Sequence, residues 1–544
     1  MKELIAGLLS KHVKLKKEEL MQAIEIPPDS SLGDYAFPCF ILARELRKKP
    51  VDISTELARE LTGTLPKEIS GVKAQGAYLN FFIDKKILAE KTIAEIINKK
   101  GNYGKGKQKG KIVIEHTSIN PNASPHVGRI RNSLIGDSIK RILEFSGLST
   151  ETHFYVNDVS KQVALLCLST KIKKFSDLLS EYIRLSKQEN EEKIFQLLNK
   201  FEKGDKETVQ KFKKIVEIAI KGQKEILNSI GIKFDFFDYE SSFLKEAEKV
   251  LNELKKTGKL FKDEEGRLVL NQSGTSIENK MKAPYLVLTR SDGTGLYPLR
   301  DLAYTIWKMK RAENNLIVLG EDQKLYFEQL KIALEFLKQK APEVIHYSFV
   351  LLQTERGKGK MSTRRGEVVL FEDFLNEAVK KAKKEIEKRK TKGDAKKVAV
   401  SAVKFSLLRN EPNRNIIFNL DEALSFEGET GPYLQYSYAR ASSILKKAKK
   451  KANEKVKALE EKEIELVKKL ENFPEIVKSA REQLNPSLIA NYTFQLAQVF
   501  NEFYHSCKVL DSEEEPFRLA LVQAFRIVMK SSLYLLGIDI MEEM

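Results

Sequence analysis

The segment covering residues 111–156 constrains the fold of this chain more than any other part. A short β-branched run, KIVIEH, precedes a helical pattern, and a second run, ETHFYV, follows it. Apolar residues recur at helical spacing over residues 129–146, and Gly147 ends the pattern. A strand, a helix and a strand within about forty residues form a βαβ unit with a right-handed crossover. The sequence therefore predicts a parallel, Rossmann-like sheet.

Later segments extend this prediction. Three further apolar runs are expected to join the same sheet: YLVLTR, NLIVLGED and HYSFVLLQ. Residues 171–224 are rich in lysine and glutamate and lack strand patterns, so they are expected to form an inserted helical segment.

Changes in pattern divide the 544 residues into three expected domains. Residues 1–107 combine helical patterns with one or two strands in GVKAQGAYLNFFI and end in a linker rich in glycine and lysine. Residues 108–385 hold the parallel sheet, and residues 386–544 are almost entirely amphipathic helix. We expect a multidomain α/β protein with an α+β N-terminal domain, a catalytic-type sheet domain and an all-α C-terminal bundle.

Composition narrows the class of protein. Lys and Arg number 94 against 76 Asp and Glu, a formal net charge of +18, which favours a polyanionic partner. Solvated lysine-rich helix faces remain an alternative explanation of that charge. The three cysteines are far apart, so neither a disulfide framework nor a zinc site is expected. No apolar run is long enough to suggest a membrane span, and we expect a cytoplasmic monomer.

The loop after the first strand is a candidate phosphate site. The sequence SPHVGRIRN enters a helix at the carboxyl end of that strand, where free backbone N–H groups attract anions. Gly128 allows close backbone approach, and His126 and Arg129 can donate to phosphate oxygens. A proline turn that merely carries a histidine is the alternative.

A second basic loop, GKGKMSTRRGEVV, follows the run HYSFVLLQ. Its glycines and cations could close on a polyphosphate, with Lys360 stabilising negative charge and Ser362 beside it. It does not fit a Walker A motif, and a solvated basic loop is the alternative.

Together, HVGR and KMSTR resemble the HIGH and KMSKS signatures of class I aminoacyl-tRNA synthetases, the second lying at residues 360–366. The surrounding sequence is similar to arginyl-tRNA synthetases over nearly the whole chain. The similar stretches are TSINPNASPHVGRIRNSLIGD, YVNDVSKQVALL, GDYAFPCFILARELRKKP and FEGETGPYLQYSYARASSILKKA. Two positions depart from the signatures, since Arg129 replaces the second histidine and Thr363 the second lysine.

An arginine substrate presents a planar cation, which fixed carboxylates can pair. Tyr297 and Asp301 are four residues apart and share a helix face, and Glu240 and Gln323 follow strand-like runs. The resemblance implies that Glu240 and Asp301 pair the guanidinium, that Tyr297 walls it and that Gln323 adds a polar contact. It also implies that Asn120 holds the α-amino and carboxylate end.

The resemblance further implies the reaction. L-Arginine is activated with ATP, accompanied by Mg²⁺, and is transferred to the 3′ end of tRNA(Arg), with adenylate formation that depends on tRNA. His126, Gly128, Arg129, Lys360 and Ser362 would bind ATP, without a metal cluster on the protein. The resemblance also implies anticodon binding in the C-terminal bundle, where tyrosines could stack on bases or simply pack: Tyr433, Tyr436, Tyr438, Tyr492 and Tyr504. Another class I synthetase and a catalytically altered tRNA-binding paralogue remain alternatives.

Overall fold

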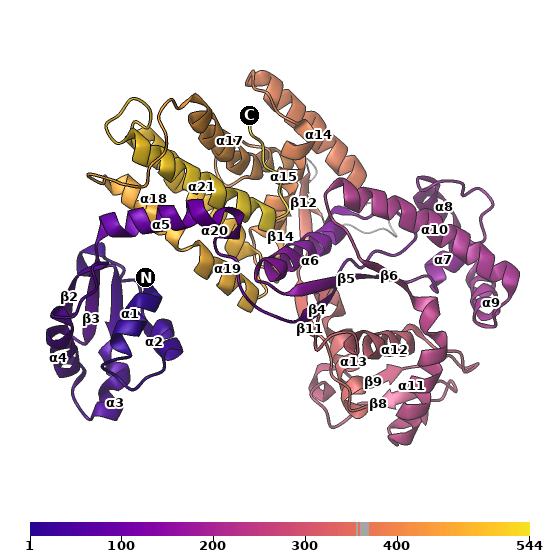
Figure 1. Ribbon diagram of the computed structural model, residues 1–544. Coiled ribbons are helices and arrows are strands. Elements are labelled where there is room, and N and C mark those ends of the chain that lie inside the picture. Colours follow the sequence, from indigo (N-terminus) through magenta and orange to yellow (C-terminus); the bar gives the residue numbers. More distant parts are fainter. Residues whose placement is uncertain (355–356, 360–368) are drawn as a thin grey trace. The chain divides into compact units, whose positions relative to one another are not determined.

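The computed structural model describes residues 1–354, 357–359 and 369–544. Its central element is a five-stranded sheet in the order β11-β10-β4-β5-β6, with every neighbouring pair parallel (Figure 1). The predicted parallel sheet is thus confirmed. The strands are β4 (Lys111–Glu115), β5 (Ser149–Val156), β6 (Phe236–Tyr239), β10 (Asn314–Gly320) and β11 (Glu343–Tyr347).

The predicted βαβ unit is present as β4, helix α6 (Val127–Phe145) and β5, with Lys111 paired to Ser149 in parallel register. From β4 the chain builds outward through β5 to β6, then returns to place β10 and β11 on the other side of β4. The direction of strand addition therefore reverses between β4 and β10. In open parallel sheets, such a reversal leaves a crevice at the carboxyl ends of the strands.

The run YLVLTR does not join the parallel sheet, so that prediction is wrong. It forms β9 (Tyr285–Val287), which belongs to a separate antiparallel sheet with β7 (Leu260–Lys262) and β8 (Leu268–Asn271). A short turn joins β7 to β8, where antiparallel pairing is the only possibility without a crossover, and a longer loop over residues 272–284 joins β8 to β9. An apolar run of this length carries no information about which sheet it enters.

The run HYSFVLLQ is divided between two sheets rather than forming one strand. Its first residues end β11, and the rest forms β12 (Val350–Thr354), which pairs with β13 (Gly357–Gly359) and β14 (Ile416–Phe418). Ser348 lies between the two strands and is buried. Its N–H donates to the carbonyl of Pro412 at 2.9 Å, and its hydroxyl donates to Glu321 at 2.6 Å. These bonds to distant segments divert the chain after β11.

Residues 171–224 hold α8 (Asp177–Ser186), α9 (Glu191–Glu202) and most of α10 (Lys206–Ser229). The carboxylate of Asp205 accepts from the N–H of Thr208 and so caps α10. Leu198 and Phe201 bury one side of α9, and Phe201 packs on Phe212 with ring centroids 4.7 Å apart. The apolar stripe of α9 is the reason for its place in the fold.

The chain divides into two compact units, which are described separately. The first comprises residues Met1–Lys100, Ile444–Glu471 and Val499–Ile527. It holds the antiparallel sheet β1-β3-β2 with helices α4 and α5, which makes it the predicted α+β N-terminal fold. Their bounds are β1 (Tyr35–Pro38), β2 (Ile69–Gln75), β3 (Tyr78–Ile83), α4 (Pro50–Thr62) and α5 (Lys85–Lys99).

The second unit comprises Gly101–Ser443, Asn472–Gln498 and Val528–Met544 and includes the parallel sheet. From residue 431 onward the regular structure is helical, as predicted for the C-terminal region. The helices of this C-terminal region are α17 (Gly431–Lys447), α18 (Glu461–Glu471), α19 (Phe473–Glu482), α20 (Ser487–Ser506) and α21 (Glu515–Leu535). Of these, α18 belongs to the first unit, and α17, α20 and α21 are divided between the two units. In the described part of the chain, no helix is long and apolar enough to cross a membrane.

Candidate active site

Helix α6 is fixed at the crevice between β4 and β10 by buried side chains. The side-chain oxygen of Asn132 accepts from the N–H of Thr117, just after β4, at 2.8 Å, and its amide donates to the carbonyl of Val318 in β10 at 2.9 Å. The Thr117 hydroxyl donates to Ser133 at 2.7 Å. Because Asn132 bridges both strands at the reversal, the amino end of α6 has a defined position.

Close packing beneath α6 depends on Gly136. A Cβ atom at that position would lie 2.3 Å from the buried ring of His116. Burial lowers the pKa of His116 to about 4, so the ring is neutral, and its Nδ1 atom lies 2.9 Å from the Thr117 hydroxyl oxygen.

His126 is the N-cap residue of α6, with extended backbone (φ −85°, ψ 160°). It forms a β-bridge with Leu370, and the N–H of Phe371 donates to the carbonyl of Pro125 at 2.9 Å. Burial, with a smaller contribution from Arg129, lowers the pKa of His126 to about 4. Its Nδ1 atom is buried without a hydrogen-bond partner in the described part of the chain. A neutral imidazole with an unused ring nitrogen can hydrogen-bond an incoming ligand.

Gly128 and Arg129 lie in the first turn of α6, and the N–H of Arg129 donates to the carbonyl of His126 at 2.9 Å. Asn120 is exposed in the preceding loop. The carbonyls of Asn120 and Ala123 accept from the side chain of Gln223 in α10 at 2.9 and 3.1 Å. The loop before α6 is thus held by the inserted segment. Lys360 and Ser362 lie outside the described residues.

Asp301 and Tyr297 lie on the first turns of α12 (Tyr297–Met309), as their spacing predicted. Tyr326, in α13 (Lys324–Phe336), donates its hydroxyl to Asp301 Oδ2 at 2.5 Å and packs on the Tyr297 ring at 5.1 Å. Burial raises the pKa of Asp301 to about 6, although the bond from Tyr326 opposes the change. Tyr297 is 50% exposed, so it can form the wall of a pocket open to a ligand.

Glu240 lies directly after β6 and is 1% exposed. Its Oε1 atom accepts from Arg300 Nε at 2.5 Å, whereas Oε2 is buried without a partner in the described part of the chain. Burial raises the pKa of Glu240 to about 8; Arg300 opposes this shift and Asp301 adds to it. The structure therefore brings Glu240 and Asp301 close enough for Asp301 to affect the charge of Glu240. Glu240 Oε2 is the carboxylate oxygen that no described residue hydrogen-bonds.

Gln323 is the N-cap residue of α13 and lies after the end of β10, one turn before Tyr326. Arg300 and Tyr326 are contacts of the candidate carboxylates that the sequence did not suggest. The sequence feature that could have pointed to them is their closeness to predicted site residues, because Arg300 precedes Asp301 and Tyr326 follows Gln323 by three residues.

Candidate metal ligands lie elsewhere. Among the described residues, the side chains that lie close enough together to hold a metal ion are those of Glu460, Glu463 and Cys507. Arg518 binds both carboxylates, with its Nε 2.7 Å from Glu463 and its Nη2 bonded to Glu460. A guanidinium already occupies the acidic cluster, so these residues do not fit a cation site.

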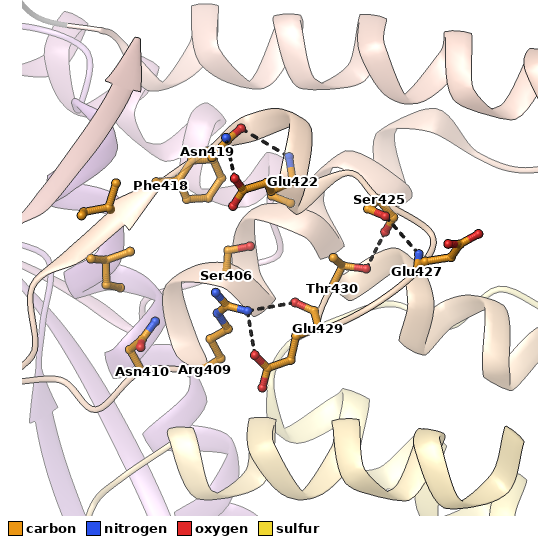
Figure 2. Close-up of a pocket in the computed structure, with 13 residues that line it drawn as sticks. Ser406, Arg409, Asn410, Phe418, Asn419, Glu422, Ser425, Glu427, Glu429 and Thr430 are labelled. Carbon is orange, nitrogen blue, oxygen red and sulfur yellow. Dashed lines mark hydrogen bonds and ion pairs between the residues drawn. The ribbon is translucent and has the colours of Figure 1, made fainter. Parts of the chain in front are cut away.

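A cavity of about 330 Å³ lies beside β14 and contains none of the predicted site residues. Figure 2 shows hydrogen bonds and an ion pair among several of the residues that line it. Arg409 pairs with Glu429 at 2.9 Å, Asn419 donates to Glu422, and Thr430 donates to the carbonyl of Ser425. The bonds of Arg409 and Thr430 hold the loop after α16 (Leu420–Ala423).

The C-terminal tyrosines differ in exposure. Tyr438 and Tyr492 are 1% and 2% exposed and pack in the protein interior. Tyr504 is 39% exposed. Tyr436 is half-buried beneath the Arg440 guanidinium, 4.8 Å from the ring centroid. The packing alternative therefore holds for Tyr438 and Tyr492.

A reversal of strand order with a helix amino terminus at its crevice is the general ligand site of doubly wound folds, and here it belongs to a class I aminoacyl-tRNA synthetase catalytic domain. Residues 92–420 match the family described as tRNA synthetases class I (R), catalytic domain. Residues 1–83 match the arginyl tRNA synthetase N terminal domain, and residues 434–544 match the DALR anticodon binding domain.

Complete relatives agree with these matches. The chain is 38% identical to an arginine–tRNA ligase of Methanocaldococcus jannaschii, covering 99% of this chain and 97% of that protein. It is also 38% identical to an arginine–tRNA ligase of Archaeoglobus fulgidus, covering 93% and 94%. The Thermus thermophilus arginyl-tRNA synthetase structure superposes with a TM-score of 0.81 at 28% identity, covering 100% of this chain and 99% of that chain. The chain belongs to the arginyl-tRNA synthetase family.

Proposed function

We propose that this chain, an arginine–tRNA ligase, joins L-arginine to tRNA(Arg) in two steps. The arginine carboxylate attacks the α-phosphorus of ATP, forming arginyl-adenylate and releasing pyrophosphate. A hydroxyl of the terminal ribose of tRNA then attacks the adenylate carbonyl carbon and releases AMP. The carboxylates of Glu240 and Asp301 at the crevice are the observation that carries the choice of amino acid.

The arginine-binding roles follow from charge and exposure. Glu240 Oε2 and the Asp301 carboxylate pair the substrate guanidinium, the exposed Tyr297 ring covers it, and Gln323 adds a polar contact. When both carboxyl groups are ionised, they and Arg300 carry a combined charge of −1, which the substrate side chain neutralises. Asn120 holds the α-amino and carboxylate end of the substrate.

The ATP-binding roles belong to the amino end of α6 and the second basic loop. His126 donates a hydrogen bond to phosphate, Gly128 gives room for the nucleotide, and Arg129 supplies a permanent positive charge in place of the signature histidine. Lys360 and Ser362 stabilise the leaving pyrophosphate, with Arg364 or Arg365 compensating for Thr363. Positioning and charge stabilisation are sufficient for such a step.

Mg²⁺ is expected to arrive with ATP, because phosphate oxygens and water supply most of its ligands in such sites. It neutralises charge on the phosphates. We propose that tRNA is bound across the domains 1–107, 108–385 and 386–544, with the anticodon on the last of them. Family matches to residues 1–83, 92–420 and 434–544 follow in the same order, and the catalytic match extends past both proposed boundaries. We also propose that the protein is cytoplasmic, because ATP, arginine and tRNA occur together in the cytoplasm. We propose in addition that it is a monomer.

Arginine-dependent chemistry tests the proposal directly. Pyrophosphate exchange is measured with each of the amino acids, with and without tRNA, followed by aminoacylation of tRNA(Arg). Among the amino acids, we expect only arginine to give exchange above background, and we expect this exchange only when tRNA is present. Exchange with another amino acid would favour a different class I specificity. No exchange with any amino acid, together with retained tRNA binding, would favour the catalytically altered paralogue.

A further inference from the structure

The inserted helical segment reaches the candidate arginine pocket through ion pairs. Glu202, the last residue of α9, has its Oε1 atom 3.2 Å from Arg290 Nη1 and 3.9 Å from Arg300 Nη1. Arg300 in turn bonds Glu240 through Nε at 2.5 Å and donates from Nη1 to the carbonyl of Gly295 at 2.8 Å. A continuous series of ion pairs and hydrogen bonds therefore connects α9 through Arg300 to Glu240.

Because these side chains are buried, their electrostatic interactions are stronger than those of ion pairs on the surface. The side chains of Arg300 and Glu240 are 3% and 1% exposed, and that of Glu202 is 11% exposed. Charges at such depth are poorly screened by solvent, so each group fixes the orientation and charge of the next. The guanidinium of Arg300 opposes the rise in the pKa of Glu240 that burial causes, so its loss would shift the Glu240 carboxyl further towards the neutral form, which cannot pair a substrate cation.

The geometry also limits how Arg300 can be held. Its guanidinium is planar, and two of its nitrogens already have fixed acceptors in Glu240 and Gly295. Glu202 approaches the same Nη1 atom from the inserted segment, and Arg290 anchors Glu202 from the loop before α12. Arg290 itself is held by the hydroxyl of Thr294 at 2.8 Å. Loss of charge at Glu202 removes the one carboxylate that holds Arg300 from the side of α9.

We propose that Glu202 and Arg300 are positioning residues for arginine: the inserted segment, through Glu202, holds Arg300 so that Glu240 presents its free oxygen to the substrate guanidinium. Neither residue touches the substrate. The proposal rests on the proposed function, because it assigns Glu240 to arginine binding. It gives the inserted segment a role in the amino acid site.

The test compares Glu202→Gln, Arg300→Lys and the control Glu207→Gln in the complete enzyme with tRNA(Arg). Glu207 lies on the same inserted segment but pairs with Lys211 at 2.7 Å on the exposed surface of α10. We expect Glu202→Gln to raise the KM for arginine about fivefold to tenfold and Arg300→Lys to raise it at least about thirtyfold. The KM values for ATP and tRNA should stay within about twofold in both variants, and Glu207→Gln should change none of them.

Binding without turnover provides a second readout. The rise in Tm caused by saturating arginine should shrink in Glu202→Gln and Arg300→Lys, while the rise caused by ATP is retained. A KM for arginine within twofold of the parent value in Glu202→Gln would overturn the proposal. So would equal losses for arginine and ATP, or an effect confined to tRNA. An inactive parent enzyme would contradict the proposed function instead, because the comparison between variants requires parent activity.

Discussion

At the scale of single residues, the candidate arginine pocket is defined by carboxyl groups kept away from water. Glu240 is almost fully buried and Asp301 lies close enough to raise its pKa further. Two neighbouring buried carboxylates are unfavourable unless a cation joins them. Arg300 supplies one positive charge, and a bound arginine side chain would supply the second. The pocket is therefore best satisfied when its substrate is present.

Replacement of Asp301 tests whether arginine and ATP are bound by separate sets of residues. Asp301→Asn keeps the size of the side chain but removes the charge that pairs the guanidinium. We expect the KM for arginine to rise about a hundredfold and the KM for ATP to stay within about twofold, measured by steady-state aminoacylation. Glu253→Gln, which alters an exposed pair with Lys256 at 2.6 Å, is the matched control. Equal changes for both substrates would argue against a pocket role for Asp301.

The pH dependence of arginine binding follows from the same groups. The pKa of Asp301 is raised to about 6 and that of Glu240 to about 8, so both are partly protonated near neutrality. Arginine pairs the ionised forms, so its KM should fall as pH rises from about 6 to about 8.5. Binding should release protons, which calorimetry in buffers of different ionisation enthalpy measures. A KM for arginine that is constant over this range would contradict the assignment.

Stability without arginine should change in the opposite direction. A carboxyl whose pKa is raised by folding binds more protons in the folded state than in the unfolded state between the two pKa values. The free energy of unfolding should therefore decrease as pH rises from about 4.5 towards 8. Denaturant titrations at several pH values measure this trend, and Asp301→Asn should reduce its slope.

At the scale of elements, α6 connects the phosphate-binding loop to the sheet. Its first residues carry the ATP-binding candidates, and Asn132 ties the helix to Val318 in β10. Further along, Ser138 donates its hydroxyl to the carbonyl of Leu535 at 2.8 Å. The position of His126 therefore depends on packing along the whole length of the helix.

Gly136→Ala tests this dependence. The added methyl group would meet the His116 ring at 2.3 Å, so α6 or the ring must move. We expect a loss of about 1–3 kcal/mol in the free energy of unfolding, and a higher KM for ATP because the amino end of α6 shifts. Gly7→Ala is the control, since no atom lies within 4 Å of its added Cβ, and it should stabilise α1 (Lys2–Leu9) by up to about 1 kcal/mol. Unchanged stability in Gly136→Ala would mean that the contact relaxes at no cost.

At the scale of the whole molecule, the net charge of +18 is matched to a polyanionic substrate. Phosphate contacts release counterions from RNA, so binding should weaken steeply with salt. The proposed arginine pocket consists of buried charged groups that salt screens poorly. The two substrates should therefore respond differently to ionic strength.

We expect the KM for tRNA to rise at least about tenfold between 50 and 200 mM KCl, as estimated from counterion release. The KM for arginine should stay within about twofold over the same range. Both are measured by aminoacylation with the other substrates saturating. A weak salt dependence for tRNA would show that the positive charge is solvated surface, as the lysine-rich helical runs alone could suggest.

The sequence by itself determined the βαβ unit and the place of His126 at the start of α6. It also indicated the shared face of Tyr297 and Asp301. Such features depend on backbone geometry and burial over a few neighbouring residues, which local patterns record. Only the tertiary structure decided that YLVLTR leaves the parallel sheet and that Ser348 divides two strands. It alone paired Glu240 with Arg300, 60 residues away, and Arg300 with Glu202 of the inserted segment. Partners so distant are chosen by how whole elements pack, and no local pattern carries that information.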